Sequence, residues 1–262
     1  MRERDFRMSA CLVLMVLLLS GCVSQESPQE SGSDAERVDE PREDEEATNE
    51  IMMEGDVEIT FVCNDGFLIV SGDTKILVDA LCTGNQEWSA PQEVQELLEK
   101  GEPPFDDVDL VLTTHDHWDH FDAEVAGKCM ENNPHAVFIS TNVAASKLKN
   151  AFPNLEGIQE RVIAVQPEEG ERISVTANGI DIEVLNIPHG SDQSMRNNGY
   201  LFTVGGVRIF HSGDFAEHYS KLKDYQLLNE GIDIAFLPYF FVRNMWEYIQ
   251  PKYVIPMHFD DP

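Results

Sequence analysis

The chain of 262 residues is poor in basic side chains. It has 18 Lys and Arg residues against 48 Asp and Glu residues, which gives a formal net charge of −30. Residues 1–50 hold five of the basic and 13 of the acidic residues, so residues 51–262 keep 13 basic and 35 acidic ones, a net charge of −22. Proteins that bind nucleic acid neutralise phosphates with Lys and Arg, so this balance argues against a nucleic-acid partner. It fits a salty or extracytoplasmic setting, where salt screens the repulsion between like charges.

Cysteine is scarce too, with five residues in the whole chain. Cys11 and Cys22 lie near the N-terminus, so Cys63, Cys82 and Cys129 remain for the rest of the chain. Three cysteines allow at most one intramolecular disulfide, which excludes a fold held together by several bridges. Cys63 and Cys82 could pair in an oxidising compartment, or Cys82 could be a free thiol near the site described below. No cysteine fits the metal-ligand pattern.

Long hydrophobic runs are missing apart from one near the N-terminus. Residues 11–19, CLVLMVLLL, follow Arg2, Arg4 and Arg7. A transmembrane helix needs about 20 apolar residues, so this run is short for a permanent span. A basic start, a short apolar stretch and small residues after it are typical of a secretory signal.

The end of that run, Leu19-Ser20-Gly21-Cys22, resembles the lipobox of prokaryotic lipoproteins, which are cleaved before the cysteine and acylated on it. The resemblance implies a signal peptide over residues 1–21 and a lipid anchor on Cys22. The protein would then be an extracytoplasmic, membrane-anchored lipoprotein, on the cell surface or the periplasmic side. An uncleaved anchor and a simple secretory signal are the alternatives.

Residues 22–54 are rich in acidic residues and contain no aromatic residue. This composition predicts a disordered tether that its own charge keeps extended. The remaining residues 55–262 have the length of one folded domain.

Six consecutive residues, His115-Asp116-His117-Trp118-Asp119-His120, place several metal-ligand side chains in one short segment. Residues 109–114 before them are typical of a short buried strand, and residues from 121 onward are typical of a helix. The segment is therefore expected on a loop at the carboxyl end of a strand, where open α/β sheets place their binding sites. Two histidines one residue apart can hold one cation, and the Asp-His pair can hold a second one nearby.

Four more candidate residues each follow a run typical of a strand. They are Asp79, His189, Asp214 and His258. A lone histidine is more often a core or surface residue than a ligand, so the order of the whole set carries the signal. That order resembles the five motifs of the metallo-β-lactamase superfamily over residues 57–258: an acidic residue after an early strand, HxHxDH, a lone His, a lone Asp and a final His.

The resemblance implies a centre of two divalent metal ions. Three histidines would hold the first ion, and one aspartate with two histidines would hold the second: His115, His117 and His189, then Asp119, His120 and His258. The Asp214 carboxylate would bridge the two ions. Zn²⁺ is expected, and Mn²⁺ or Fe²⁺ are alternatives that mixed His and carboxylate ligands accept.

The same resemblance implies a hydrolytic mechanism. A water molecule or hydroxide between the ions would be the nucleophile, because a bound cation lowers the pKa of water. Asp119 and Asp214 are the candidate catalytic residues, and Asp119 would orient the water or take up its proton. Asp79 would support the ligands from behind. His211, three residues before Asp214, is either a further support or a histidine that packs in a strand.

The fold implied is a four-layer αββα sandwich of the α/β (α+β) class. The strands are expected near residues 57–62, 67–70, 75–78, 109–114, 136–139, 161–165, 172–176, 180–185, 200–204, 207–213, 232–237 and 253–257. The helices are expected near residues 91–100, from 121 onward, and near 142–152, 217–228 and 242–249. Loops 83–104 and 190–198 are expected to roof the pocket, Trp118 is expected to pack beneath its loop, and Arg196 is expected to be exposed.

The activity implied is hydrolysis of an ester, lactone, amide or phosphodiester in a small-molecule substrate. Members of the superfamily that reduce dioxygen at a di-iron centre carry a glutamate where this chain has His117, so hydrolysis is favoured over redox chemistry. About 210 residues leave no room for the separate clamping domain of members that process nucleic acids. The alternatives are a non-catalytic metal-binding surface lipoprotein and a phosphodiesterase or nuclease type of member.

Overall fold

The computed structural model describes residues 56–83, 88–190, 195–216 and 219–259. The predicted signal peptide, the lipobox with Cys22 and the acidic tether lie outside the described residues and stay predictions. Among the residues described, no helix is both long and apolar enough to cross a membrane.

The first of two six-stranded sheets is built by the N-terminal half of the described chain. Its strands lie in chain order: β1 (Glu58–Cys63), β2 (Gly66–Ser71), β3 (Thr74–Val78), β4 (Leu110–Leu112), β5 (Val137–Ser140) and β6 (Val162–Ala164). The first three strands form an antiparallel meander, and β3 to β6 are parallel. Parallel neighbours need crossover connections, and helices supply them: α1 (Gln92–Lys100), α2 (Ala123–Asn132), α3 (Asn142–Ala151) and α4 (Ile158–Arg161).

The second sheet is built by the C-terminal half. Its strands follow the order β12-β11-β10-β9-β8-β7: β7 (Arg172–Ala177), β8 (Ile180–Asn186), β9 (Asn198–Val204), β10 (Val207–His211), β11 (Ile234–Pro238) and β12 (Tyr253–Met257). Strands β7 to β10 are antiparallel, and β10 to β12 are parallel. Helix α5 (Val242–Ile249) connects β11 to β12.

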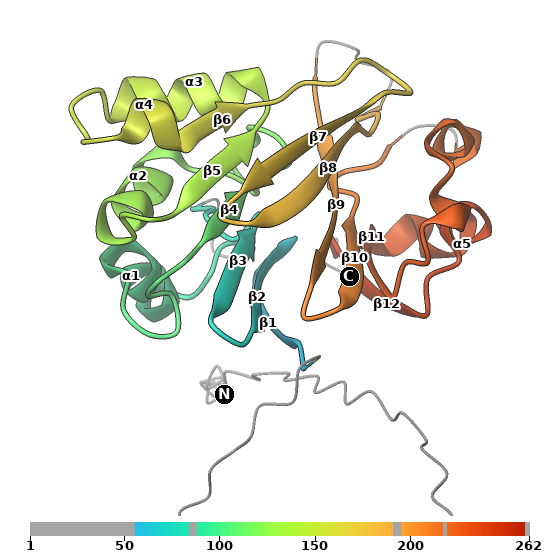
Figure 1. The fold of residues 1–262 in the computed structure, drawn as a ribbon, viewed down its shortest axis with the longest axis horizontal. Helices are drawn as coiled ribbons and strands as arrows, with labels where there is room; N and C mark the ends of the chain where they lie inside the picture. The colour runs from blue at the N-terminus through green and yellow to red at the C-terminus, as the bar shows by residue number, and fades with distance from the viewer. Residues whose placement is uncertain (1–55, 84–87, 191–194, 217–218, 260–262) are drawn as a thin grey trace, which may run out of the picture.

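The two sheets face each other, and the helices cover their outer faces (Figure 1). Alternation along the strands explains these layers, because successive side chains of a strand point to opposite faces. In β3, Ile76 and Val78 belong to the core between the sheets, whereas Leu77 packs under the helices. On the other side, Leu201 and Leu237 pack with Met245 of α5. The αββα sandwich expected from the sequence is therefore the observed fold.

Local sequence signals place the helix that follows the HxHxDH loop. The Asp122 side chain accepts hydrogen bonds from the backbone N–H groups of Glu124 and Val125, at 2.8 and 3.1 Å, and so caps the start of α2. Gly127 in the same helix faces the ring of Phe152, where an added Cβ would lie 2.0 Å from the nearest ring atom. The cap and this close contact fix α2, and thus the end of the preceding loop.

One predicted helix is wrong in type. The helix expected near residues 217–228 is, in its described part, a pair of 3₁₀ segments at Tyr219–Tyr225 and Leu227–Asn229. Leu222 and Tyr225 are buried three residues apart, a spacing that a 3₁₀ helix aligns on one face. Gln226 then takes a left-handed backbone conformation with φ 52°, which interrupts the segment.

The pairing of the cysteines, left open by the sequence, is also settled. The sulfur atoms of Cys63 and Cys82 are bonded to each other. Cys129 is a buried free thiol, and burial raises its pKa to about 12. Cys82 is therefore not a free thiol at the site, and the bond ties the end of β1 to the segment that follows Asp79.

Candidate metal centre

The candidate ligands come from the carboxyl ends of strands in both sheets. The HxHxDH loop follows β4, and Asp79 follows β3. In the second sheet, His189, Asp214 and His258 follow β8, β10 and β12. These three strands run in the same direction, because β8 is antiparallel to β9, β9 is antiparallel to β10, and β10 to β12 are parallel. All seven predicted ligands therefore meet at one edge of the sandwich.

A first group joins three histidines and Asp214. The ring nitrogens His115 Nε2 and His117 Nδ1 lie 2.9 Å apart, and His189 Nε2 lies 3.3 Å from Asp214 Oδ2. One ligand atom from each of the four residues lies within 4.8 Å of the others. This is the set expected for the first ion.

A second group joins Asp119, His120 and His258, whose ligand atoms also lie within 4.8 Å of one another. His120 Nε2 and His258 Nε2 lie 3.6 and 3.7 Å from Asp119 Oδ2. Asp214 reaches this group as well, with Oδ1 at 3.2 Å from His120 Nε2 and Oδ2 at 3.2 Å from His258 Nε2. Its two oxygens thus contact both groups, as a bridging carboxylate requires.

Asp79 fixes the orientation of the ligands from behind, as expected. Its Oδ1 accepts a hydrogen bond from the backbone N–H of Thr114 at 2.7 Å. Its Oδ2 accepts from Thr114 Oγ1 at 2.7 Å and from His120 Nδ1 at 2.9 Å. His120 Nδ1 therefore carries a proton, and Nε2 is the ring nitrogen that faces the site.

His115 is oriented by the same network. Because Thr114 Oγ1 donates to Asp79, it is free to accept from His115 Nδ1, which lies 3.0 Å away. That arrangement leaves His115 Nε2 directed at the site. Carboxylate, hydroxyl and imidazole thus set the tautomers of two candidate ligands before any cation binds.

The protonation states of the candidate ligands also suit the binding of cations. Burial lowers the pKa of His115 well below its ordinary value and lowers that of His117, so both rings are neutral donors. Burial acts in the same direction on His120 and His258, but the Asp214 carboxylate outweighs it, so that the pKa of His120 is raised well above its ordinary value and that of His258 to about 9. Although burial opposes it, contact with His120 lowers the pKa of Asp214 well below its usual range. A cation at the second group would take the place of protons on these two rings.

Several buried polar atoms at the centre lack a partner. His120 Nε2, His189 Nε2 and Asp214 Oδ1 are buried and have no hydrogen-bond partner among the described residues. Buried polar atoms left unsatisfied are costly, and here they face one another. Divalent metal ions would satisfy them, so the donor set fits the expected ions. Which residue holds which ion stays a prediction.

The turn between β1 and β2 also contacts the candidate ligands, and no residue of it was predicted for the site. Asn64 Nδ2 donates to Asp119 Oδ2 at 3.2 Å and lies 3.4 Å from the Asp119 backbone oxygen. Asp65 is fully buried and forms a third group of possible ligands with His120 and Asp214. Strand β1 runs in the direction of β3, so the rule that pointed to Asp79 applies equally to Asp65.

His211 supports this turn. Its Nε2 donates to the backbone oxygen of Asp65 at 3.0 Å, and its Nδ1 accepts from the Gly213 N–H at 3.2 Å. Burial lowers the pKa of the ring, which is consistent with the neutral form that these two bonds require. His211 thus joins the turns that carry Asp65 and Asp214. A role in supporting the metal ligands stays a prediction.

Aromatic side chains surround the approach to the centre. A cavity of about 150 Å³ is lined by His189, Asp214, Phe215, Ala216, Pro238, Phe240, Phe241 and His258. The Tyr239 and Phe240 side chains beside it are about half exposed, at 55% and 49%. The Tyr239 and Phe259 rings lie 5.4 Å apart, as do the Trp88 and His258 rings. Trp88 thus supplies part of the roof expected from loop 83–104, whereas the aromatic wall at 239–241 was not predicted.

Two predictions about single side chains need comment. Trp118 is 52% exposed, so the expectation that it packs beneath the loop is wrong. Its neighbours His117 and Asp119 turn inward to the site, which leaves Trp118 pointing outward. Arg196 is partly buried rather than exposed and lies 3.7 Å from a Glu168 carboxylate oxygen. In loop 190–198, residues 191–194 lie outside the described residues.

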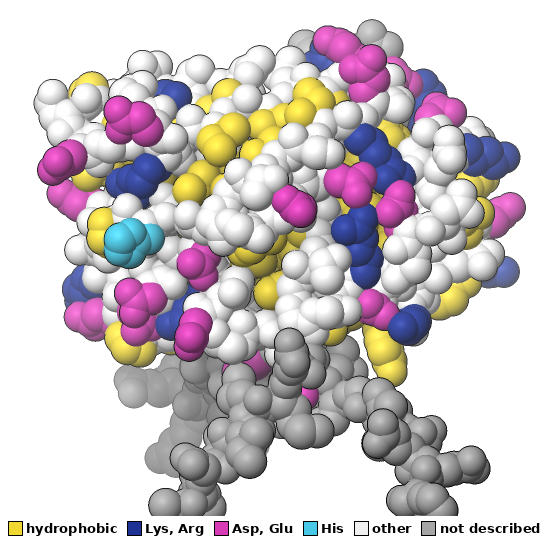
Figure 2. Space-filling view, viewed as in Figure 1, with side chains coloured by type: hydrophobic (Ala, Val, Ile, Leu, Met, Phe, Trp, Pro, Cys, Tyr) yellow, Lys and Arg dark blue, Asp and Glu magenta, His cyan; other side chains and the backbone are white. Residues whose placement is uncertain are grey.

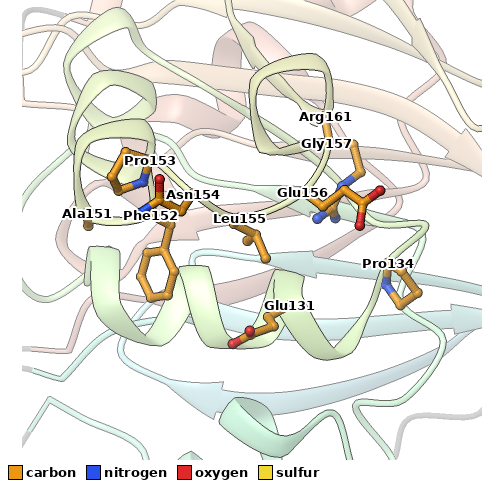
Figure 3. Close-up of a pocket in the computed structure, with 10 residues that line it drawn as sticks. All are labelled: Glu131, Pro134, Ala151, Phe152, Pro153, Asn154, Leu155, Glu156, Gly157 and Arg161. Atoms are coloured by element: carbon orange, nitrogen blue, oxygen red, sulfur yellow. The ribbon is translucent and has the colours of Figure 1, made fainter.

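A larger cavity, of about 810 Å³, lies away from this chemistry. Figure 3 shows that its lining residues come from α2, α4 and the segment between α3 and α4, among them Glu131, Phe152 and Arg161. The guanidinium Nη1 of Arg161 donates to the backbone oxygens of Met130, Asn133 and Ala136, at 3.1 to 3.2 Å. The guanidinium of Arg161 therefore serves the packing around α2 and α4. We assign this cavity no part in the activity.

The fold and the site together define a metal-binding αββα protein. The family model described as "Beta-lactamase superfamily domain" matches residues 74–261, and the chain belongs to this family. It is 29% identical over 222 residues to a metal-dependent hydrolase of Pyrococcus furiosus, covering 78% of this chain and 85% of that one. It is 28% identical over 251 residues to the Salmonella choleraesuis protein named "Probable L-ascorbate-6-phosphate lactonase UlaG", covering 76% of this chain and 68% of that one.

Solved structures agree on the fold. A metallo hydrolase from the archaeon Ignicoccus hospitalis superposes with a TM-score of 0.57 at 19% identity, covering 78% of this chain and 83% of that one. At this identity the comparison supports the fold alone.

Proposed function

We propose that this protein is a metal-dependent hydrolase with two divalent cations, Zn²⁺ first among them, that cleaves a small ester or lactone outside the cytoplasm. The observation that carries the proposal is Asp214, whose two carboxylate oxygens contact both groups of candidate ligands. A purely structural metal site is closed by four protein ligands. Seven candidate ligands, one of which is a carboxylate shared by both groups, instead suit a catalytic centre of two metal ions.

The cations would lower the pKa of a water molecule held between them and would stabilise the negative charge that develops on the substrate. The protein supplies the proton acceptor. Asp119 is partly accessible, and one of its oxygens, Oδ2, is held by the amide of Asn64 at 3.2 Å. A carboxylate anchored in this way is positioned to take the proton of the attacking water and pass it to the leaving group.

The surroundings of the site favour an uncharged substrate with an apolar part. Phe240 and Phe241 line the cavity beside Asp214 and His258, and Phe215 closes its inner side. Acidic side chains are spread over the face of the molecule in Figure 2, with the basic side chains among them. The net charge of −22 over residues 51–262 disfavours a polyanionic substrate. The lactonase name of one relative supports a lactone as the bond that is cleaved, and the substrate in that name carries a phosphate group.

The test is turnover of chromogenic esters, lactones and bis-phosphodiesters by metal-loaded protein, together with metal analysis by mass spectrometry. The wild type should bind two ions per chain and hydrolyse an ester or lactone faster than the metal-free protein does. His117→Ala and Asp214→Ala should lose bound metal and activity and stay folded by circular dichroism. Asp116→Asn is the matched control, because Asp116 lies in the same loop but pairs with Lys147 at 2.6 Å.

Two outcomes would contradict the proposal. Unchanged metal content in both ligand variants would remove the ligand assignment. Two bound ions without turnover on any class of substrate would favour the other candidate, a metal-binding surface lipoprotein without catalysis.

We also propose that Cys22 carries a lipid anchor and that residues 22–54 act as a tether between the membrane and the enzyme. The lipobox resemblance and the acidic composition of the tether support this. Expression of the full chain in a bacterial host should give a detergent-extracted, lipid-labelled protein, and Cys22→Ala should abolish the label. A label that persists in Cys22→Ala would refute the anchor.

A further inference from the structure

The Asp65 carboxylate is the most unusual group near the metal centre. It is fully buried, and neither of its oxygens has a hydrogen-bond partner among the described residues. Burying an ionised carboxylate without a partner is costly, and even a neutral carboxyl needs an acceptor for its proton. The fold would not place it there without compensation.

The position of Asp65 is enforced by its neighbours rather than left to chance. His211 Nε2 holds its backbone oxygen at 3.0 Å. The next residue, Gly66, lies so close to the backbone after β3 that an added Cβ would be 2.7 Å from the Asp79 oxygen. Asn64 is tied to Asp119, and Cys63 is bonded to Cys82. Four contacts thus press this turn against the site and keep the carboxylate inside.

The carboxylate points at atoms that lack partners themselves. One carboxylate oxygen each from Asp65 and Asp214 and one ring nitrogen of His120 lie within 4.8 Å of one another. The buried His120 Nε2 and Asp214 Oδ1 are unsatisfied, as Asp65 is. Two carboxylates and an imidazole that converge in the buried interior form the donor set of a divalent cation.

We propose that Asp65 is an additional carboxylate ligand of the cation held by His120 and Asp214. This inference rests on the proposed two-ion function. The second ion would then have five protein ligands, with oxygens from Asp65, Asp119 and Asp214 and nitrogens from His120 and His258. The first ion keeps three histidines and Asp214. The two sites therefore differ in preference: the first suits Zn²⁺, and the second, richer in oxygen and higher in coordination number, suits Mn²⁺ or Fe²⁺.

The experiment compares Asp65→Asn with the wild type in metal binding, without reference to turnover. Apo proteins are titrated with Mn²⁺ and Zn²⁺ by calorimetry, and bound Mn²⁺ is followed by electron paramagnetic resonance. Loss of residues behind metal ligands typically costs about 10–100-fold in affinity, so loss of a ligand should cost at least as much. Asp65→Asn should weaken the Mn²⁺ site by this factor and leave the Zn²⁺ site unchanged. Asp65→Ser, which removes the carboxylate with a smaller side chain, should do the same, and Asp116→Asn should change neither site.

Thermal unfolding gives a second, independent measure, because the effect of Asp65→Asn on the melting temperature should differ between the metal-free and the Mn²⁺-loaded protein. In the metal-free protein, Asp65→Asn should melt no lower than the wild type, because the carboxyl group that it replaces is buried without a hydrogen-bond partner. With Mn²⁺ added, its melting temperature should rise less than that of the wild type.

The outcomes separate the inference from the function on which it rests. Two ions bound by Asp65→Asn and Asp65→Ser with wild-type affinities would overturn the role of Asp65 and leave the proposed hydrolase intact. A wild type that binds only one ion under all conditions would overturn the two-ion function and this inference with it.

Discussion

The substitution Asp79→Asn tests how the centre is organised before a cation binds. Asn has the shape of Asp and tolerates the left-handed backbone that residue 79 adopts, with φ 46°. Its amide oxygen can still accept the hydrogen bond from the Thr114 N–H that Asp79 Oδ1 accepts at 2.7 Å. Its NH₂ group then faces Thr114 Oγ1 and His120 Nδ1, where Asp79 Oδ2 accepts two hydrogen bonds. An N–H group that faces Nδ1 requires the His120 ring to move its proton to Nε2, the nitrogen directed at the site.

The magnitude follows from the bond that is lost. A hydrogen bond to a charged group contributes about 1.5–3 kcal/mol, and about 1.4 kcal/mol corresponds to a factor of ten in affinity. We therefore expect the affinity for the ion near His120 to fall about 10–100-fold, the range found for residues that orient metal ligands. The ion at His115, His117 and His189 should be affected less, because Asp79 contacts none of these three rings directly in the described structure.

The assay is competition with a chromogenic chelator at fixed pH, which reports the two binding steps separately. Asp233→Asn is the matched control: Asp233 also accepts a backbone hydrogen bond, from Arg208 at 2.7 Å, but it lies before β11, at the opposite end of the strands from the site. It should lower stability without changing metal affinity. If Asp79→Asn kept the wild-type affinity for both ions, the argument that Asp79 sets the His120 tautomer would be refuted.

The remaining predictions concern protons and packing. The pKa of His258 is about 9 in the metal-free protein, so below pH 9 a cation must displace the proton of this ring. The apparent affinity of the second group for a cation should therefore fall as the pH falls, by roughly tenfold per pH unit for each proton released. Calorimetry at pH 6, 7 and 8 checks this, and equal affinities would contradict it. Gly127→Ala should destabilise the fold by about 1–3 kcal/mol, because the new Cβ would lie 2.0 Å from the Phe152 ring. Denaturant unfolding measures the loss, and the same change should cost less in a Phe152→Ala background, where the obstructing ring is gone.

The seven candidate ligands could be predicted from the sequence because each follows a strand whose apolar residues are easily recognised. Alternating or continuous apolar runs locate the strands, and residues just after parallel strands of one sheet share an edge. Asp79, His189, Asp214 and His258 were found by that rule, and the structure brings them together with the HxHxDH loop.

The same sequence did not reveal Asp65 or the aromatic wall. Asn-Asp-Gly is typical of any exposed turn, and its burial here follows from contacts with His211 and with the backbone after β3, which only the folded chain supplies. No role was predicted for Phe240 and Phe241, which lie between the strand expected near residues 232–237 and the helix expected near 242–249. Their place beside Asp214 and His258 depends on how β11 and β12 end, and periodicity carries no information about that.

The distribution of candidate ligands between the sheets would give bound cations a structural role as well. The first sheet contributes the HxHxDH loop, and the second contributes His189, Asp214 and His258. Neither sheet holds a complete set, so each of the proposed ions would contact both halves of the sandwich. Without cations, buried atoms of His120, His189 and Asp214 have no hydrogen-bond partner among the described residues where the sheets meet. Cations would satisfy these atoms, and because they would bind the folded state, they would stabilise it by mass action. The candidate ligands would thus also join the two halves of the fold.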